Sequence, residues 1–169
     1  HTGSKIGKSI CENDCGPLIK EILEISKKFN CKIVCPIDVV VSKSIEGAGK
    51  IKDIKEINDD EIILDIGPKT ILVIKKIINV SNTVLWNGPA GYFENPNFQA
   101  GTKEILGIIA QKTINDKIFS VAGGGETVAA INKFKKFDSF TFVSTAGGAF
   151  LEFLEGKTLP GIKALNQNV

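Results

Sequence analysis

The stretch Phe119–Ala130, FSVAGGGETVAA, decides how the fold of the whole chain is interpreted. Its apolar start is typical of a buried strand, and the residues after its three glycines favour a helix. Glycines at such a turn remove the Cβ atoms that would keep a ligand away from the backbone. The first amides of the helix would then be free to bind an anion. The stretch therefore predicts a phosphate-binding turn, although a glycine-rich connection that only allows close packing has the same pattern.

The composition is that of a soluble globular domain. The chain has 169 residues, enough for one domain with a core, and is 43% hydrophobic and 24% charged. Its formal net charge of +2 gives no reason to expect a nucleic-acid partner. No apolar run is as long as a membrane span, so no membrane partner is expected either. All 21 basic residues are lysine, which excludes arginine clamps from any mechanism built on this chain alone.

Apolar segments alternate along the chain between strand-like and helix-like spacing. Strands are predicted at Cys31–Cys35, Asp38–Val41, Ile62–Ile66, Thr83–Trp86, Lys117–Ala122 and Phe140–Ser144. Helices are predicted at Pro17–Phe29, from Pro68, from Pro96, after the glycines of the opening stretch and around Phe150–Leu154. No hairpin signal joins the strands. The pattern predicts an α/β fold, an open parallel sheet with helices on both faces, Rossmann-like in arrangement.

Several segments between these elements are less regular. Asp38–Val41 follows a proline and is expected at a sheet edge. Lys43–Asp60 is polar and rich in lysine, and we interpret it as a loop or small excursion whose isoleucines anchor a short element. Trp86 follows apolar residues and is expected in the core rather than in a site. The end of the chain, Lys157–Val169, is interpreted as a tail.

The four cysteines form a C-x₃-C…C-x₃-C arrangement that invites a zinc interpretation. They are Cys11, Cys15, Cys31 and Cys35. In a strand, however, four residues span roughly 13 Å, too far for two thiolates of one tetrahedral site. We therefore interpret the cysteines as small apolar side chains of a cytosolic protein and expect no zinc.

Three of the predicted strands end in unusual loops: Asn87–Glu94, Gly123–Thr127 and Thr145–Gly148. In an open parallel sheet, ligands bind beyond the carboxyl ends of the strands, so we expect these loops at one edge. Two of them are strand–glycine–helix turns, and their helix N-termini would direct partial positive charge to that edge. Together they predict a polyphosphate site. A dinucleotide site would use the same edge, but Val128 stands where its third glycine is required.

Polar residues in these loops suit such a site. Glu126, at the start of its helix, either relieves the helix dipole or, beside a polyphosphate, holds Mg²⁺ together with waters and phosphate oxygens. Thr127 is placed to cap the helix or to donate to phosphate. Glu94 follows Tyr92 and Phe93 and is either an ordinary exposed carboxylate or an acceptor for ribose hydroxyls beside a base slot.

These segments together resemble phosphoglycerate kinase in order and spacing. The segments are Asp65–Thr70 (DIGPKT), Val84–Glu94 (VLWNGPAGYFE), Val121–Thr127 (VAGGGET), Val143–Ala149 (VSTAGGA), Leu151–Lys157 (LEFLEGK) and Leu159–Gly161 (LPG). The likeness begins near Ile6 and covers nearly the whole chain, but it corresponds only to the back part of a longer, two-domain enzyme.

The resemblance implies transfer of a phosphoryl group between ATP and 3-phosphoglycerate in glycolysis, in the cytoplasm, with Mg²⁺ and ATP or ADP. The nucleotide-binding residues implied by it are Asn87, Gly88, Pro89, Glu94, Gly124, Gly125, Glu126 and Thr127. Among these, Asn87 would contact the outer phosphates, Glu94 the ribose and Glu126 the Mg²⁺. Gly147 and Gly148 would face the transferring group and so be catalytic. The complete enzyme would be a monomer.

Three positions depart from the usual pattern of that family. Glu126 stands where aspartate is usual, while Ala146 and Ile63 stand where glycine is usual. Because Ile63 would lie near the base slot, the packing of the adenine is expected to differ. The longer side chain of Glu126 must fold back to reach the metal.

The resemblance also implies that the chain is incomplete. Residues 1–159 would be part of a nucleotide-binding C-terminal domain, and residues 160–169 its C-terminal tail. The absence of methionine is in keeping with a piece of a longer protein. Because the family binds phosphoglycerate in an N-terminal domain, that domain of the same protein is the expected partner, and we expect the chain alone to be inactive. The alternative is a non-catalytic nucleotide-binding module or a folded relic.

Overall fold

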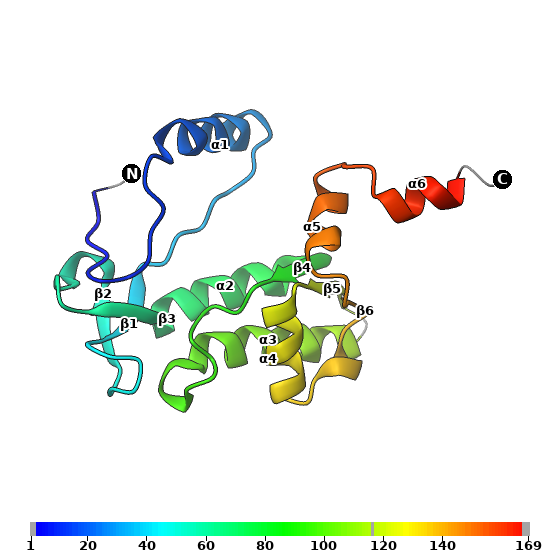
Figure 1. The fold of residues 1–169 in the computed structure, drawn as a ribbon. Coiled ribbons are helices and arrows are strands. Elements are labelled where there is room, and N and C mark those ends of the chain that lie inside the picture. The colour runs from blue at the N-terminus through cyan, green and yellow to red at the C-terminus, as the bar shows by residue number, and fades with distance from the viewer. Residues whose placement is uncertain (1–2, 116, 167–169) are drawn as a thin grey trace.

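The structure, a computed structural model, describes residues 3–115 and 117–166 as two small sheets and several helices (Figure 1). The strands are β1 (Asp38–Ser42), β2 (Lys50–Asp53), β3 (Ile62–Ile66), β4 (Thr83–Asn87), β5 (Phe119–Gly123) and β6 (Phe142–Ser144). The α-helices are α1 (Gly16–Lys28), α2 (Pro68–Val80), α3 (Ala100–Ile114), α4 (Gly125–Lys133), α5 (Gly148–Leu154) and α6 (Pro160–Asn166). Three single-turn 3₁₀ helices are η1 (Ile54–Glu56), η2 (Pro96–Phe98) and η3 (Phe137–Ser139).

Strands β4, β5 and β6, here called sheet B, form the open parallel sheet that the sequence predicts. Their spatial order is β4-β5-β6, and both pairs are parallel. Helices α3 and α4 make the two crossovers between them, as parallel neighbours require. Helices α2 and α3 lie on one side of sheet B and α1 stands on the other (Figure 1). The α/β class and the open parallel sheet are therefore confirmed.

Strands β1, β2 and β3 form a second sheet, sheet A, which is antiparallel. The spatial order is β2-β1-β3, so β1 is the central strand, and its predicted position at a sheet edge was wrong. Strand β2 and η1 lie inside the polar segment Lys43–Asp60, where a short anchored element was expected. The buried valines Val39 and Val41 explain the central position, because they form a small core with Ile57.

The strand predicted at Cys31–Cys35 is absent from this structure. These residues, all of them described, have irregular backbone conformation and are exposed to solvent. Isolated extended segments are not stable, because a strand needs a hydrogen-bonded neighbour and a packed face. All four cysteines are free thiols; Cys15 is half-buried and the other three are exposed, so the prediction of a buried apolar strand was wrong.

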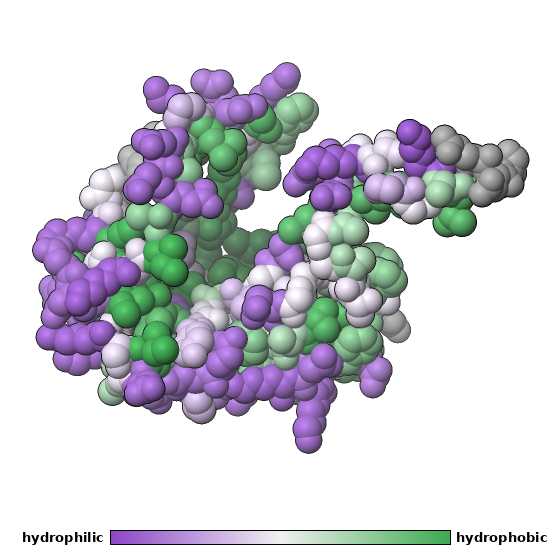
Figure 2. Space-filling model, viewed as in Figure 1, coloured by the Kyte–Doolittle hydropathy of each residue, from purple (hydrophilic) through white to green (hydrophobic). Residues whose placement is uncertain are grey.

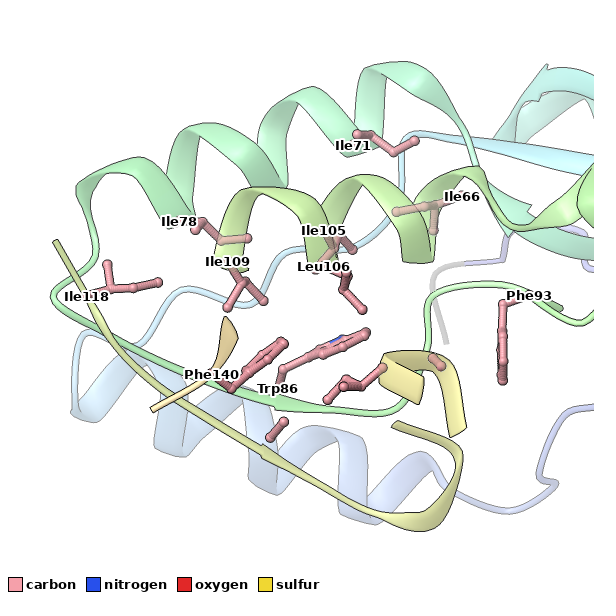
Figure 3. Close-up of a cluster of buried hydrophobic side chains, with 13 residues drawn as sticks. Ile66, Ile71, Ile78, Trp86, Phe93, Ile105, Leu106, Ile109, Ile118 and Phe140 are labelled. Carbon is pink, nitrogen blue, oxygen red and sulfur yellow. The ribbon is translucent and has the colours of Figure 1, made fainter. Parts of the chain in front are cut away.

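The main core lies between helices α2 and α3 and one face of sheet B (Figure 3). Trp86 is buried in it, as predicted, and stacks on Phe140 with the ring centroids 6.0 Å apart. Ile105, Leu106 and Ile109 reach the same cluster from α3. Burying each such side chain stabilises the fold by about 1.5–3 kcal/mol, so this face supplies much of the stability.

Asp38 joins sheet A to the helix that covers sheet B. Its buried carboxylate accepts hydrogen bonds from the amides of Lys69 (2.9 Å) and Thr70 (2.7 Å) in the first turn of α2, and from the Thr70 hydroxyl (2.7 Å). Burial acts to raise the pKa of Asp38, but these hydrogen bonds outweigh it and hold the pKa below its ordinary value. The carboxylate therefore serves as an N-cap for α2 supplied from a neighbouring strand.

Helix α1 forms where the sequence predicts a helix, but it is not packed on the body of the molecule. None of its residues is buried, and Leu18, Ile22, Ile25 and the following Phe29 are all exposed. At the other end of the chain, the segment interpreted as a tail contains the short helix α6. No helix in residues 3–115 and 117–166 is long and apolar enough to span a bilayer.

Candidate functional site

The register of sheet B brings the three strand ends of interest side by side. Asn87 is paired with Gly123, and Gly123 is paired with Ser144. The loops that follow β4, β5 and β6 therefore leave the sheet from one row. This is the arrangement predicted from the sequence, and it is the edge at which open α/β sheets bind ligands.

The turn between β5 and α4 requires glycine at its centre. Gly124 has φ = 94°, in the region that side chains with a Cβ rarely adopt, and a Cβ there would lie 2.5 Å from the Asn87 Oδ1. The next residue, Gly125, opens α4 and has open space around it. The bare backbone at the start of α4 is thus accessible to an anion, and the helix dipole would favour one.

Thr127 joins the turn after β5 to the loop after β4. Its hydroxyl oxygen accepts a hydrogen bond from the Gly88 amide at 2.6 Å, and its side chain is fully buried. We expected this hydroxyl to cap the helix or to donate to phosphate. In the structure the hydroxyl oxygen accepts from a neighbouring loop, an interaction that leaves its donor role toward phosphate a prediction, and Thr127 thereby holds Gly88 and, next to it, Asn87 and Pro89 against the start of α4.

Glu94 lies at the far end of the same loop and is exposed. The Nζ of Lys133, in the last turn of α4, donates to the main-chain carbonyls of Phe93 (2.6 Å) and Glu94 (2.9 Å). Thr127 and Lys133 are six residues apart, which corresponds to about 9 Å along a helix axis. Glu94 is therefore held beside the C-terminal end of α4, and the glycine turn lies at the N-terminal end.

The third loop continues from β6 into α5. Gly147 has φ = 53°, and Gly148 is the first residue of the helix. Neither glycine has a neighbouring atom where a Cβ would stand, so the backbone is open to solvent here as well. The Phe150 ring of α5 packs against Gly123, which places the start of α5 close to the end of β5.

Glu126 suits a metal that shares its ligands with a substrate. It is exposed in the first turn of α4, next to the open backbone of Gly125. No group of three or more His, Cys, Asp or Glu side chains that could hold a metal occurs among the described residues. One carboxylate is nevertheless what a Mg²⁺ ion bound mainly through phosphates and waters takes from a protein. The residues present therefore fit Mg²⁺ with a polyphosphate.

Strand β3 lines two clefts near the loop after β4. One, of about 380 Å³, is bounded by residues of β3 together with Pro89, Ala90, Gly91 and Tyr92. The other, of about 620 Å³, is bounded by Ile6, by residues 8–11, by Ile45 and by β3. Ile63 and Leu64 line both clefts, so a flat apolar group bound in either cleft would lie beside Ile63.

The sequence did not single out the residues that hold the middle of the loop after β4. The Thr102 hydroxyl accepts from the amides of Ala90 (3.1 Å) and Gly91 (3.3 Å). The buried Asp65 carboxylate accepts from the Gly101 amide at 2.8 Å, and a Cβ on Gly91 would collide with it. Burial raises the pKa of Asp65, although the amide hydrogen bonds of Gly101 and of Ile66 oppose this.

Spacing along the chain gave no signal for these contacts, because each joins segments far apart in the sequence. Asp65 stands between apolar residues at the end of a strand, and that placement marks it as a buried polar group in need of a partner. For Lys133 and Thr102 the sequence offers no comparable indication, since both belong to helical segments with several other polar residues.

Comparison with known proteins gives one family. The family model described as phosphoglycerate kinase matches residues 1–157. Phosphoglycerate kinases from Xanthobacter autotrophicus and Francisella philomiragia are each 46% identical to the chain over 167 residues, which are 98% of this chain and 42% of the relative. The chain thus spans less than half the length of the curated relatives that it matches.

Solved structures agree with the sequence relatives. The structure of phosphoglycerate kinase from Coxiella burnetii is 40% identical, has a TM-score of 0.89, and is matched over 98% of this chain and 42% of that one. The phosphoglycerate kinase of Pyrococcus horikoshii is 33% identical, with a TM-score of 0.72 over 89% of this chain and 36% of that one. By its sequence and its fold, the chain belongs to the phosphoglycerate kinase family.

Proposed function

We propose that the edge of sheet B formed by the three loops binds the phosphates of ATP or ADP with Mg²⁺. One observation carries the proposal. The register Asn87–Gly123–Ser144 gathers two glycine turns and the Asn-Gly-Pro loop in one row. Each glycine turn leads into a helix, and the backbone at both turns is open to solvent. A polyphosphate is the ligand that several adjacent unpaired amides and helix N-termini suit best.

Each residue at this edge then has a role. Gly124 and Gly125 let the phosphates approach the start of α4, and Glu126 contributes the protein ligand to Mg²⁺. Asn87 contacts the outer phosphates from the loop after β4, which Thr127 holds in place. Gly147 and Gly148 face the group that is transferred.

The base and the ribose lie further along the loop after β4. We propose that Glu94 accepts from the ribose hydroxyls and that the adenine packs in the apolar space beside Ile63. The order of these groups along α4 supports this arrangement. The glycine turn is at the N-terminal end of the helix and Glu94 is held near its C-terminal end, so phosphates and ribose would lie in that sequence.

We propose further that this site belongs to a phosphoglycerate kinase, which transfers a phosphoryl group between ATP and 3-phosphoglycerate in glycolysis, in the cytoplasm. When bound, Mg²⁺ neutralises charge on the phosphates. The residues of this chain contribute positioning and oriented amides, which is most of what phosphoryl transfer needs from a protein. In this proposal residues 1–159 belong to the nucleotide-binding domain, residues 160–169 are its C-terminal tail, and the 169-residue chain alone does not turn over.

The partner in this proposal is the remainder of the phosphoglycerate kinase polypeptide. The face of sheet B opposite the core exposes Leu85, Phe119 and Phe142. The Coxiella burnetii structure matches 98% of this chain with a TM-score of 0.89, yet this match covers only 42% of that protein. The larger part of such a protein is therefore available to bind phosphoglycerate and to cover the apolar face.

Calorimetric titration of the chain with ADP, with and without Mg²⁺, tests the site. We compare the wild type with Glu126→Gln and with the control Glu24→Gln, the same change at an exposed position on α1. With Mg²⁺ present, Glu126→Gln should weaken ADP binding by about tenfold or more, as loss of a charged ligand does, while Glu24→Gln should not. With EDTA all three proteins should bind alike. Equal affinity of all three with Mg²⁺ would refute the metal role.

A turnover assay distinguishes a phosphoglycerate kinase from a nucleotide-binding module that is not catalytic. ATP consumption that depends on 3-phosphoglycerate should be absent with the chain alone. It should appear when the unmatched part of a relative, such as the Xanthobacter autotrophicus protein, is supplied. Binding of MgADP without any restored turnover would favour the alternative, a nucleotide-binding module that is not catalytic.

A further inference from the structure

The loop Asn87–Glu94 has no regular structure of its own to hold its shape. Beyond β4, which ends at Asn87, no helix or strand occurs until η2 begins at Pro96. The loop nevertheless carries Asn87, Gly88, Pro89 and Glu94, half of the eight nucleotide-binding residues that the family resemblance implies. Its conformation depends on the contacts that its backbone makes with neighbouring elements.

The two ends of this loop are held by the same helix. At the first end, the Gly88 amide donates to Thr127 in the first turn of α4, at 2.6 Å. At the other end, the Lys133 ammonium in the last turn of α4 donates to the carbonyls of Phe93 and Glu94. Hydrogen bonds from a charged donor are stronger than neutral ones of the same geometry, and the bond from Lys133 to Phe93 is part-buried.

Lys133 is positioned for this task by more than its two hydrogen bonds. Its Nζ lies 5.7 Å from the centroid of the Phe93 ring, within the range of a cation–π contact. The Phe93 side chain is itself buried, only 4% exposed, and belongs to the main core. The ammonium thus connects a core residue to Glu94 and fixes the backbone from which the Glu94 side chain projects.

We propose that α4 holds the loop Asn87–Glu94 in its conformation by contacts at both ends. Lys133 is the positioning residue that orients Glu94 toward the ribose. The inference rests on the proposed nucleotide site and adds a residue that has no direct contact with the ligand. Helix α4 then has two functions. Its N-terminus binds anions, and its side chains connect the phosphate end of the site to the ribose end.

The first test measures the loop without any nucleotide. In Lys133→Met the alkyl stem remains and the ammonium is lost; in Lys133→Arg a charged donor remains; Lys135→Met is an exposed control just beyond the helix. Hydrogen exchange at residues 93–95, beside the two carbonyls that Lys133 binds, should be faster by about tenfold in Lys133→Met, as expected for the loss of charged hydrogen bonds, and unchanged in the other two variants. Unchanged exchange in a folded Lys133→Met would refute the proposal that Lys133 holds the loop.

The second test measures recognition of the ribose. Calorimetry compares MgADP with its 2′,3′-dideoxy analogue, which lacks the hydroxyls assigned to Glu94. The wild type should prefer MgADP, Lys133→Met should lose most of that preference, and Lys133→Arg should regain it. A preference that survives in Lys133→Met would overturn the role of Lys133 alone. Absence of MgADP binding to the wild type would refute the proposed function, and with it the role of Lys133 in ribose recognition. The hydrogen-exchange experiment would still decide whether Lys133 holds the loop.

Discussion

The two faces of sheet B carry side chains of similar polarity but have different surroundings. On one face Trp86 and Ala122 are buried beneath helices α2 and α3. On the other face, the register places Leu85 beside Val121 and Val121 beside Phe142. Leu85 is 47% exposed and Phe142 is 57% exposed, although they alternate along the strands with core residues.

This open face is hollowed between α1 and the arm formed by α5 and α6, and Figure 2 shows hydrophobic atoms on the floor of the hollow. Exposed apolar surface of this extent usually marks an interface. Parallel strands are normally covered on both faces and are apolar on both, and that is the pattern in this sequence. The strands of sheet B are therefore suited to burial on both faces, and only one face is covered by the described residues.

The largest effect should separate the two faces directly. Trp86→Ala should lower the free energy of unfolding by about 3–5 kcal/mol, because it empties a packed site beside Phe140. Leu85→Ala, the neighbouring residue on the open face, should cost only about 1 kcal/mol, because its side chain is already half in water. Urea unfolding followed by circular dichroism measures both, with Trp86→Phe as a milder variant. Equal losses would mean that the two faces do not differ.

A smaller, pH-dependent change in the free energy of unfolding is expected at Asp38, which caps the helix on the covered face. Asp38→Asn weakens the N-cap of α2 and should cost about 1–2 kcal/mol at neutral pH. Because the pKa of Asp38 is lowered in the folded state, its contribution is present above the ordinary aspartate pKa of about 3.9 and is lost as the pH falls through the lowered value. Urea midpoints of wild type and variant should therefore converge at acid pH. A constant gap between them would contradict the linkage.

The smallest change in stability is expected on the open face. Phe142→Lys should alter the free energy of unfolding by no more than about 0.5 kcal/mol, because the ring is largely exposed. The same substitution should reduce binding of a hydrophobic dye, since it places a charge at one end of the apolar row of Leu85, Val121 and Phe142. Val80→Lys, at a position 83% exposed at the end of α2, is the control and should leave dye binding unchanged. A large loss of stability in Phe142→Lys would show that this face is packed after all.

The same contrast explains which parts of the fold could be predicted from the sequence. The strands and helices from β3 to α5 have local apolar periodicity that agrees with their final packing, and they were placed within a few residues. Cys31–Cys35 has equally strand-like residues but no pairing partner among the described residues, so its local preference had nothing to stabilise it. The antiparallel pairing of β1 was missed because the connection to β2, residues 43–49, lacks the two-residue loop that marks a hairpin in a sequence.

In the candidate site, too, features with a local sequence signature could be predicted and contacts between distant segments could not. Glycines and a carboxylate at strand ends have a local signature, so the row in which Gly124 and Glu126 lie could be predicted, while their roles in binding are proposals. The contact of Thr127 with Gly88 and that of Lys133 with Phe93 cross between segments about forty residues apart, 39 and 40 by number. Nothing in the spacing of one segment indicates which backbone group of the other it will meet.

The most direct test of the proposed nucleotide site is hydrogen exchange of the wild-type chain with and without saturating MgADP, resolved along the sequence. Slower exchange is expected at Gly88, at Gly124–Thr127 and at Gly147–Gly148, with no change in α1 or at residues 31–37 on the open side. Protection confined to α1, to residues 31–37 or to the exposed strand face, with the three loops unchanged, would contradict the claim that the carboxyl edge of sheet B is the nucleotide site.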